Sequence, residues 1–244
     1  MEKQELRDKI SALKIEKQSF LNDTFFWVKL AREAVEQLPD TRFEFEVPKA
    51  GQVGKTGKMR TVARNNGKKI KNRIVSKDIY NSAFVSAVAA VEDYLSKVMT
   101  WILLYDNKRI KCTIAGVNFS KEVTVVDLID KDRDTLIKNI IDQRVEGLFY
   151  ASPQKQMEYF DKALGIKVDD DIWGKWIEIK ARRDLWIHNA GVVNQIYIDK
   201  VREYKLCDFG AEAIIDEQYF GDCVATLKTI IGRIDRNIRN IYKV

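Results

Sequence analysis

Apolar residues recur at intervals of three and four over most of this 244-residue chain. That spacing marks one face of an α-helix. Helices are predicted at about residues 3–38, 79–105, 130–148, 152–164, 172–189 and 223–241. The second of them keeps one apolar stripe from Tyr80 to Tyr105, and Pro39 ends the first. The sequence therefore predicts an all-α fold, a helical bundle preceded by an N-terminal helical arm.

Two features interrupt the N-terminal part of this pattern. Asn22, Asp23 and Thr24 favour the position just before a helix, so they could cap a second helix and divide the arm in two. Residues 40–77 then change character: RFEFEV alternates like a short strand, MRTV can pair with it, and four glycines lie among lysines. We therefore expect three parts: an arm over residues 1–40, a basic, partly extended linker or ribbon over 41–78, and a main helical domain over 79–244.

Positive charge is concentrated in one segment of the chain. Residues 48–77 hold ten Lys or Arg and no acid, whereas the whole chain carries a formal +6, so the remainder sums to −4. Such a segment favours contact with a polyanion through phosphate charge, because it contains no aromatic residue on which bases could stack. The predicted nucleic-acid ligands are Lys55, Lys58, Arg60, Arg64, Lys68, Lys69 and Lys71. The alternative is a solvated linker that binds nothing.

The sequence does not support a membrane or secreted protein. The longest uncharged run, Tyr80–Val91, has 12 residues and is too short to span a membrane. The N-terminus is charged from its second residue, unlike a secretory signal. Three widely spaced cysteines favour a reduced, cytoplasmic chain over a disulfide framework.

Metal and nucleotide motifs are incomplete in this chain. AGQVGKTG resembles a phosphate-binding loop, but position 49 is lysine where the motif needs glycine. Aspartates alternating over 130–134 resemble a calcium loop, but residues 135 and 141 are threonine and isoleucine where that loop needs glycine and glutamate. These aspartates, like the run at 169–171, are more typical of helix starts. With one histidine and unpaired cysteines, no metal and no cofactor is predicted.

The one histidine of the chain, His188, lies in ARRDLWIHNAG at the end of the helix predicted over 172–189. On that helix Arg183 falls within the apolar stripe, where a guanidinium is costly unless it is paired or lines a wet cleft. Asp184 lies four residues before His188, so its carboxylate is expected to orient the imidazole. Gly191 lets the backbone turn after the helix. The alternative is a buried Arg–Asp structural network with an incidental histidine.

The string RRDLWIHNAG resembles the signature of the HEPN superfamily: arginine, a polar residue, three or four further residues, then histidine. Arg183, Asp184 and His188 match it, whereas Arg182 lies in the permitted window but lacks the polar residue after it. The long helix with AAVEDYLSKVMTWIL, and a last helix packed on the motif helix, are also similar to members of the superfamily. The resemblance covers about residues 79–244, with the RiboL-PSP-HEPN group as one candidate subfamily.

The resemblance implies metal-independent cleavage of RNA at the interface of a homodimer, where two Arg–His pairs face one cleft. It implies that His188 transfers protons and that Arg183 stabilises the phosphorane. Asp184 and Asn189 would orient the histidine or the phosphate.

Two further residues are expected to support this site, Glu92 from the facing helix and Arg182. Many members of the superfamily act in antiphage or toxin systems, and the resemblance implies such a role here. Other members have lost catalysis, so a non-catalytic RNA-binding or protein-binding scaffold stays open. A third hypothesis is an accessory subunit of a defence complex that binds a partner protein through residues 3–38. The expected partners are thus RNA, a second copy of the chain and that partner protein, and not a membrane.

Overall fold

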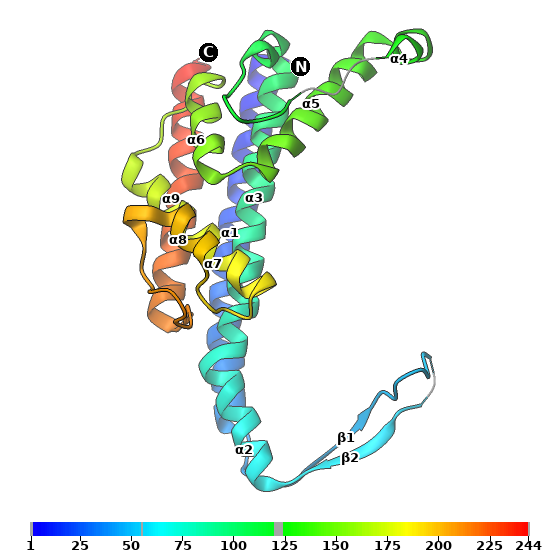
Figure 1. Ribbon diagram of the computed structural model, residues 1–244, viewed down its shortest axis with the longest axis vertical. Coiled ribbons are helices and arrows are strands. Elements are labelled where there is room, and N and C mark those ends of the chain that lie inside the picture. Colours follow the sequence, from blue (N-terminus) through cyan, green and yellow to red (C-terminus); the bar gives the residue numbers. More distant parts are fainter. Residues whose placement is uncertain (1, 55, 120–123, 244) are drawn as a thin grey trace.

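The computed structural model describes residues 2–54, 56–119 and 124–243. Three long helices run side by side along the molecule: α1 (Lys3–Gln37), α3 (Ile79–Tyr105) and α9 (Glu217–Ile241) (Figure 1). Each packs against the other two, and their buried apolar side chains form one core. The described residues are mostly helical, with one two-stranded antiparallel hairpin, which confirms the helical part of the prediction.

The first helix, α1, is continuous, so the predicted break at residues 22–24 is wrong. Thr24 Oγ1 donates a hydrogen bond to Phe20 O within the helix, at 2.7 Å, instead of capping a new one. Asn22 Oδ1 accepts a hydrogen bond from Lys228 Nζ of α9, at 2.7 Å. The side chains that α1 buries in the shared core are Leu6, Ile10, Leu13, Leu21 and Val28. The helix expected as a separate arm is therefore an integral part of the bundle.

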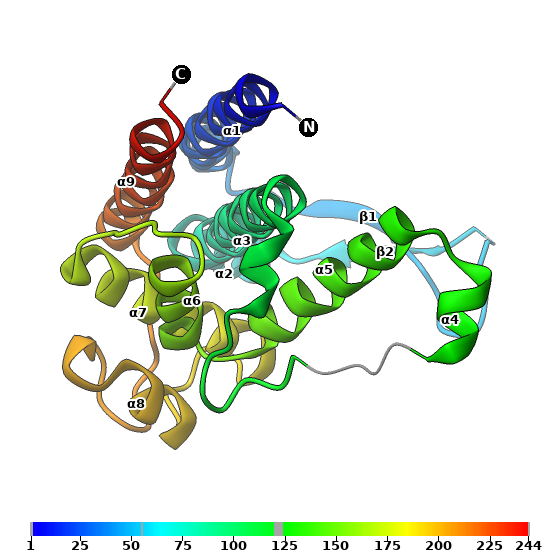
Figure 2. The ribbon, with the colours of Figure 1, turned by 90° about the horizontal axis from the view of Figure 1, so that it is seen from above.

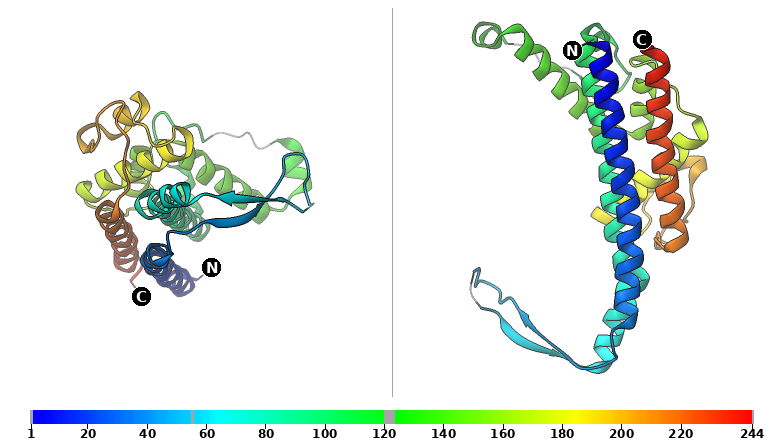
Figure 3. Two further views of the ribbon diagram at one scale, coloured as in Figure 1. Left: turned by 90° about the horizontal axis from the view of Figure 1, so that it is seen from below. Right: turned by 180° about the vertical axis from the view of Figure 1, so that it is seen from behind.

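The segment expected as a linker folds in two different ways. β1 (Phe43–Val47) and β2 (Lys58–Val62) form the antiparallel hairpin that the alternating pattern predicts. The second half is helical, because α2 (Arg64–Arg73) continues through one π-helical turn (Ile74–Asp78) into α3. The prediction of a linker over 41–78 is thus wrong for this second half. These residues extend α3, whose apolar side chains lie in the core. Figures 1 and 3 show the hairpin projecting from the α2 end of the bundle.

Shorter helices complete the chain: α4 (Val125–Asp130), α5 (Arg133–Tyr150), α6 (Pro153–Lys162), α7 (Asp170–His188) and α8 (Gln195–Val201). Those predicted at about 130–148, 152–164 and 172–189 are confirmed, whereas α4 and α8 were not predicted. Asp132 caps α5 by accepting hydrogen bonds from two backbone N–H groups, at 2.9 Å each, as expected for one of the aspartates. In Figures 1 and 2, α4 and α5 extend from the same side of the bundle as the hairpin.

Helix α7 is buried on almost every side. Trp173 and Trp176 lie in the core shared with the long helices, whereas Ala181 and Leu185 form a second apolar cluster with α8. The single apolar stripe predicted for this helix therefore covers only part of its buried surface. Its last residue, His188, is exposed, so the end of α7 carries the site candidates from the core to the surface.

Candidate active site

Helix α7 ends at His188, and the turn that follows fixes the position of this residue. Asn189 N and Gly191 N both donate to Leu185 O, at 2.7 and 3.1 Å, so the free carbonyl at the helix end is satisfied. Gly191 has a φ of +80°, and a Cβ there would lie 2.6 Å from the ring of Trp186. Glycine is required at this position by both conformation and space. The turn expected after the motif is confirmed.

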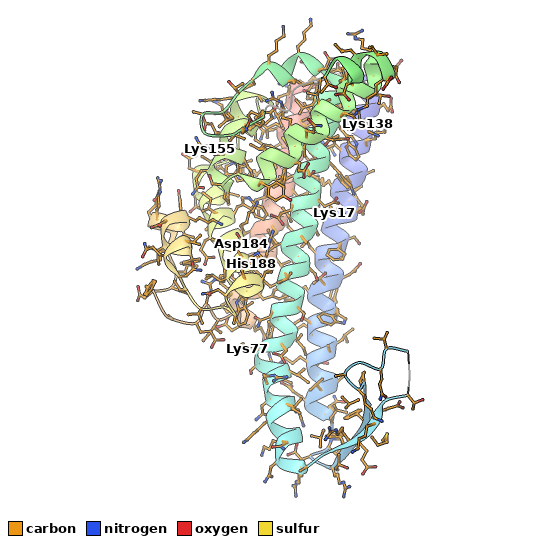
Figure 4. The ribbon with its side chains drawn as sticks, turned by 45° about the vertical axis from the view of Figure 1, so that its right-hand side comes forward. Lys17, Lys77, Lys138, Lys155, Asp184 and His188 are labelled. Carbon is orange, nitrogen blue, oxygen red and sulfur yellow. The ribbon has the colours of Figure 1, made fainter. Side chains whose placement is uncertain are left out.

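Arg183 and His188 line one cleft of about 640 Å³, which lies between α3, α7 and the junction of α5 with α6. His188 is exposed, and 18% of the Arg183 side chain is accessible. Tyr150 of α5 and Lys200 of α8 line other parts of the same cleft. Figure 4 shows Asp184 and His188 next to each other on α7, beside α3. The motif side chains therefore reach solvent at a common concave surface.

Glu92 of α3 lies between two cations of α7. Its carboxylate is hydrogen-bonded to the guanidinium of Arg183, and its Oε1 lies 3.0 Å from Lys180 Nζ. Burial lowers the pKa of Lys180 below its ordinary value, against the opposing effect of the Glu92 charge. The structure thus brings Glu92 to Arg183, where the sequence placed it. Lys180 was missed, although it lies three residues before Arg183, a spacing that puts both on one helix face.

The carboxylate of Asp184 pairs with two cations and not with the histidine. Its Oδ1 lies 3.1 Å from Arg183 Nη1, and its Oδ2 accepts a hydrogen bond from Lys200 Nζ at 3.0 Å. Within the part of the chain that the structure describes, the imidazole of His188 has no hydrogen bond and no ion pair. The expected contact between Asp184 and His188 is therefore not formed, because Lys200 on the unpredicted helix α8 pairs with the carboxylate.

Two of the predicted site residues lie outside the cleft. Arg182 is buried, where its Nε donates to Glu178 Oε1 and its Nη1 donates to Ile214 O, both at 2.8 Å. It forms a buried structural network with Glu178, so it does not support the site directly as expected. Asn189 Nδ2 donates to Val192 O at 2.6 Å and so holds the turn after α7.

The charge of the cleft is mixed. Besides Glu92 and Asp184, the carboxylates of Asp93 and Glu146 line it. Among the residues that the structure describes, no group of three or more His, Cys, Asp and Glu is placed to hold a metal ion. The cations that line the cleft are Lys180, Arg183 and Lys200, and each of them is paired with Glu92 or Asp184.

Six of the seven predicted phosphate ligands lie along β2 and α2, at one end of the bundle, below Lys77 in Figure 4. Lys55 lies outside the described residues. Lys71 is bound within the molecule: its Nζ donates to Leu38 O at 2.6 Å and lies 3.6 Å from Asp40 Oδ1. The side chains of the others have neither a hydrogen bond nor an ion pair to any described residue: Lys58, Arg60, Arg64, Lys68 and Lys69. These five cations are available for a ligand.

Comparison with known proteins gives no match. No family model matches the chain, and neither a curated protein nor a solved structure matches it. Over the described ranges, no helix is sufficiently long and apolar to cross a membrane.

Proposed function

We propose that this protein is a metal-independent endoribonuclease that acts as a homodimer, with Arg183 and His188 of each copy at the active site. One observation carries the proposal: both side chains line the same cleft, and His188 stands exposed there without an internal partner among the described residues. The resemblance of RRDLWIHNAG to the HEPN signature supports the same chemistry. A role in antiphage or toxin-type defence is proposed on that resemblance alone.

The chemistry suits these side chains. In the proposed reaction the ribose 2′-oxygen attacks the adjacent phosphorus and the bond to the 5′-oxygen breaks, which leaves a 2′,3′-cyclic phosphate and a 5′-hydroxyl. One neutral imidazole takes the proton of the 2′-hydroxyl, and one imidazolium gives a proton to the 5′-oxygen. The guanidinium of Arg183 donates hydrogen bonds to the phosphoryl oxygens as negative charge develops on them. Because the chain has a single histidine, two imidazoles require two copies.

The surface around His188 favours coverage by another chain. Ile187 and Val192, before and after His188 in the chain, are 47% and 41% exposed, and Tyr150 at the cleft is 83% exposed. Exposed apolar and aromatic side chains of this kind are typical of protein interfaces. A second copy that covers them would bring its own Arg183 and His188 to the same cleft. Sedimentation of the purified protein tests this step, and a monomer at all concentrations would contradict it.

Cleavage in the presence of a chelator tests the proposal as a whole. We expect purified protein to cut RNA in excess EDTA, because no step uses a metal. His188→Ala is expected to lower the rate by about 10²- to 10⁴-fold, the usual contribution of a general acid or base, while the dimer stays intact. The substituted residue is exposed, so the fold should not depend on it. Unchanged cleavage by His188→Ala would remove the proposal.

A non-catalytic RNA-binding scaffold is the second candidate. The pairing of Arg183 with Glu92 and Asp184 supports it, because a guanidinium held by two carboxylates has a structural role already. This function requires salt-sensitive RNA binding and no cleavage. Cyclic phosphate ends made by the wild-type protein and lost in Arg183→Ala would rule it out.

Binding of a partner protein through α1 is supported by a different surface. Phe26, Trp27 and Leu30 are 64%, 50% and 67% exposed on this helix. As an accessory subunit, the protein would bury them against its partner. Deletion of α1 cannot test this, since the helix fills part of the core. Substitution of the three side chains by polar residues can, and a complex unaffected by it would count against the hypothesis.

A further inference from the structure

The hairpin has two faces of different chemistry. In its register Phe43, Phe45 and Val47 lie opposite Val62, Arg60 and Lys58, in that order. Residues directly opposite each other in an antiparallel pair share a face, and alternate residues along each strand do too. These six residues therefore form one face, which combines two aromatic rings with two cations. We refer to it as the aromatic–basic face.

The opposite face carries the acidic residues. Glu44 lies opposite Thr61, and Glu46 lies opposite Met59. Glu44 is paired with Arg42 at 3.0 Å, on its own side of the hairpin. The strands thus segregate two carboxylates from two cations that have no ion pair to any described residue. Segregation of this kind leaves the positive charge of Arg60 and Lys58 uncompensated on one surface.

The aromatic–basic face is accessible at its centre and fixed at its base. Phe45 is 57% exposed and stacks on Phe43, with ring centroids 6.1 Å apart and an angle of 22° between the ring planes. The ring of Phe43 packs against Gly67 of α2, where a Cβ would lie 3.3 Å from it. Anchoring of one ring on α2 orients the other toward solvent. The unpaired cations of α2 continue the positive charge beyond the hairpin.

We infer that the aromatic–basic face is a binding platform for single-stranded RNA, with a base stacked on Phe45 and backbone phosphates beside Arg60 and Lys58. An exposed aromatic ring offers every unpaired base a stacking surface, and neighbouring cations hold the backbone. A duplex hides the faces of its bases, so the platform selects single strands. The choice of RNA as the nucleic acid rests on the proposed function. The sequence alone missed the platform, because Phe45 precedes the basic segment and only the register places it opposite Arg60.

Binding of a fluorescein-labelled oligouridylate to the full chain tests the inference, in a His188→Ala background that prevents cleavage. We expect Phe45→Ala to weaken binding by roughly 5- to 150-fold, the usual effect of losing one stacked base. Its dependence on salt concentration should not change. Phe45→Trp should restore binding. Arg60→Ala should instead reduce the slope of log affinity against log salt by about 0.7, the value for one phosphate contact on a single strand.

Met59→Ala is the matched control. Met59 is 59% exposed, close to the 57% of Phe45, but it lies on the acidic face of the same hairpin. Binding by Met59→Ala should equal that of the parent. The inference is overturned if Phe45→Ala binds as tightly as the parent, if Met59→Ala weakens binding equally, if the oligouridylate does not bind, or if a duplex competes as well as the single strand.

The two proposals fail separately in these measurements. Binding that depends on Phe45, without RNA cleavage by the protein that retains His188, overturns the nuclease and leaves the platform. Cleavage that depends on His188, with binding indifferent to Phe45, overturns the platform and leaves the nuclease.

Discussion

The carboxylate of Glu92 on α3 is hydrogen-bonded to the guanidinium of Arg183 on α7. This contact joins two helices that are far apart in the chain, and it holds the motif arginine at the wall of the cleft. A guanidinium has five N–H donors. The contacts with Glu92 and Asp184 leave donors for a phosphate, so the pair can position Arg183 without blocking it.

Loss of the Glu92 carboxylate should destabilise the protein. In Glu92→Ala, Lys180 and Arg183 lose a shared partner while only 9% and 18% of their side chains are accessible. We expect the free energy of unfolding to fall by about 2–3 kcal/mol, as measured by urea denaturation, because two poorly hydrated cations are left close together. Asp93→Ala is the control, since Asp93 pairs with Lys17 and Lys97 from a more exposed position. It should cost less than about 1 kcal/mol. Equal losses would contradict this role of Glu92.

Neighbouring arginines should behave differently. Arg182 is 3% exposed and pairs with the buried Glu178 at 2.8 Å, so Arg182→Ala should lower stability by about 3–5 kcal/mol through the unpaired carboxylate. Arg183→Ala should lower stability by less than about 2 kcal/mol, because Glu92 remains paired with Lys180 and its carboxylate is partly accessible to solvent. Thermal or urea denaturation of both variants measures the difference. A larger loss in Arg183→Ala would mean that the motif arginine is primarily structural.

Stability should decline in alkaline solution because of a buried cluster around Glu178. Its carboxylate accepts hydrogen bonds from the hydroxyls of Tyr197, at 2.7 Å, and Tyr219, at 2.6 Å. Burial, together with the Glu178 charge, raises the pKa of both phenols. Above about pH 10 the unfolded chain loses these protons while the folded chain keeps them, so stability falls as pH rises.

Urea denaturation between about pH 9 and about pH 11 measures this slope. Tyr197→Phe should make it shallower by up to about 1.4 kcal/mol per pH unit, the contribution of one proton. Tyr150→Phe, at a position 83% exposed, should leave the slope as in the parent. An unaltered slope in Tyr197→Phe would show that the proton on this phenol does not couple to folding.

The turn after α7 should depend on Gly191. A methyl group there meets the Trp186 ring at 2.6 Å and also requires an unfavourable φ of +80°. Gly210 has the same φ with nothing within 4 Å of its missing Cβ, which makes it a matched control. Gly210→Ala should cost about 1–2 kcal/mol from backbone strain alone. Gly191→Ala should cost about 1–3 kcal/mol more from overpacking, and should displace His188 and reduce RNA cleavage. Equal stability losses would show that Trp186 moves aside freely.

Local patterns predicted the elements of this fold better than its contacts. Periodicity located the long helices, and alternation in RFEFEV located the first strand of the hairpin, because each pattern is a property of a single segment. One side of α7 is buried because it packs against α8. This helix has only seven residues, and so short a segment shows no clear helical periodicity in the sequence. The docking of α1 onto α3 and α9 likewise involves segments distant in sequence.

The same distinction explains the candidate site. The polar residue after Arg183 distinguished it from Arg182, and the structure buries Arg182 while Arg183 lines the cleft. Spacing along the helix could not show that Lys200 takes the Asp184 carboxylate, since that cation comes from another helix. Nor could composition show that Phe45 lies on the same face of the hairpin as Arg60, because the register of the two strands decides which residues share a face.

The chemical ends of the RNA fragments made in EDTA show whether Arg183 and His188 cut the strand. We expect 2′,3′-cyclic phosphate and 5′-hydroxyl ends from the wild-type protein, and none above background from Arg183→Ala or His188→Ala, while both variants remain folded dimers. The proposed nuclease is ruled out if the His188→Ala protein makes the same ends at the wild-type rate, or if the wild-type protein leaves 3′-hydroxyl and 5′-phosphate ends instead.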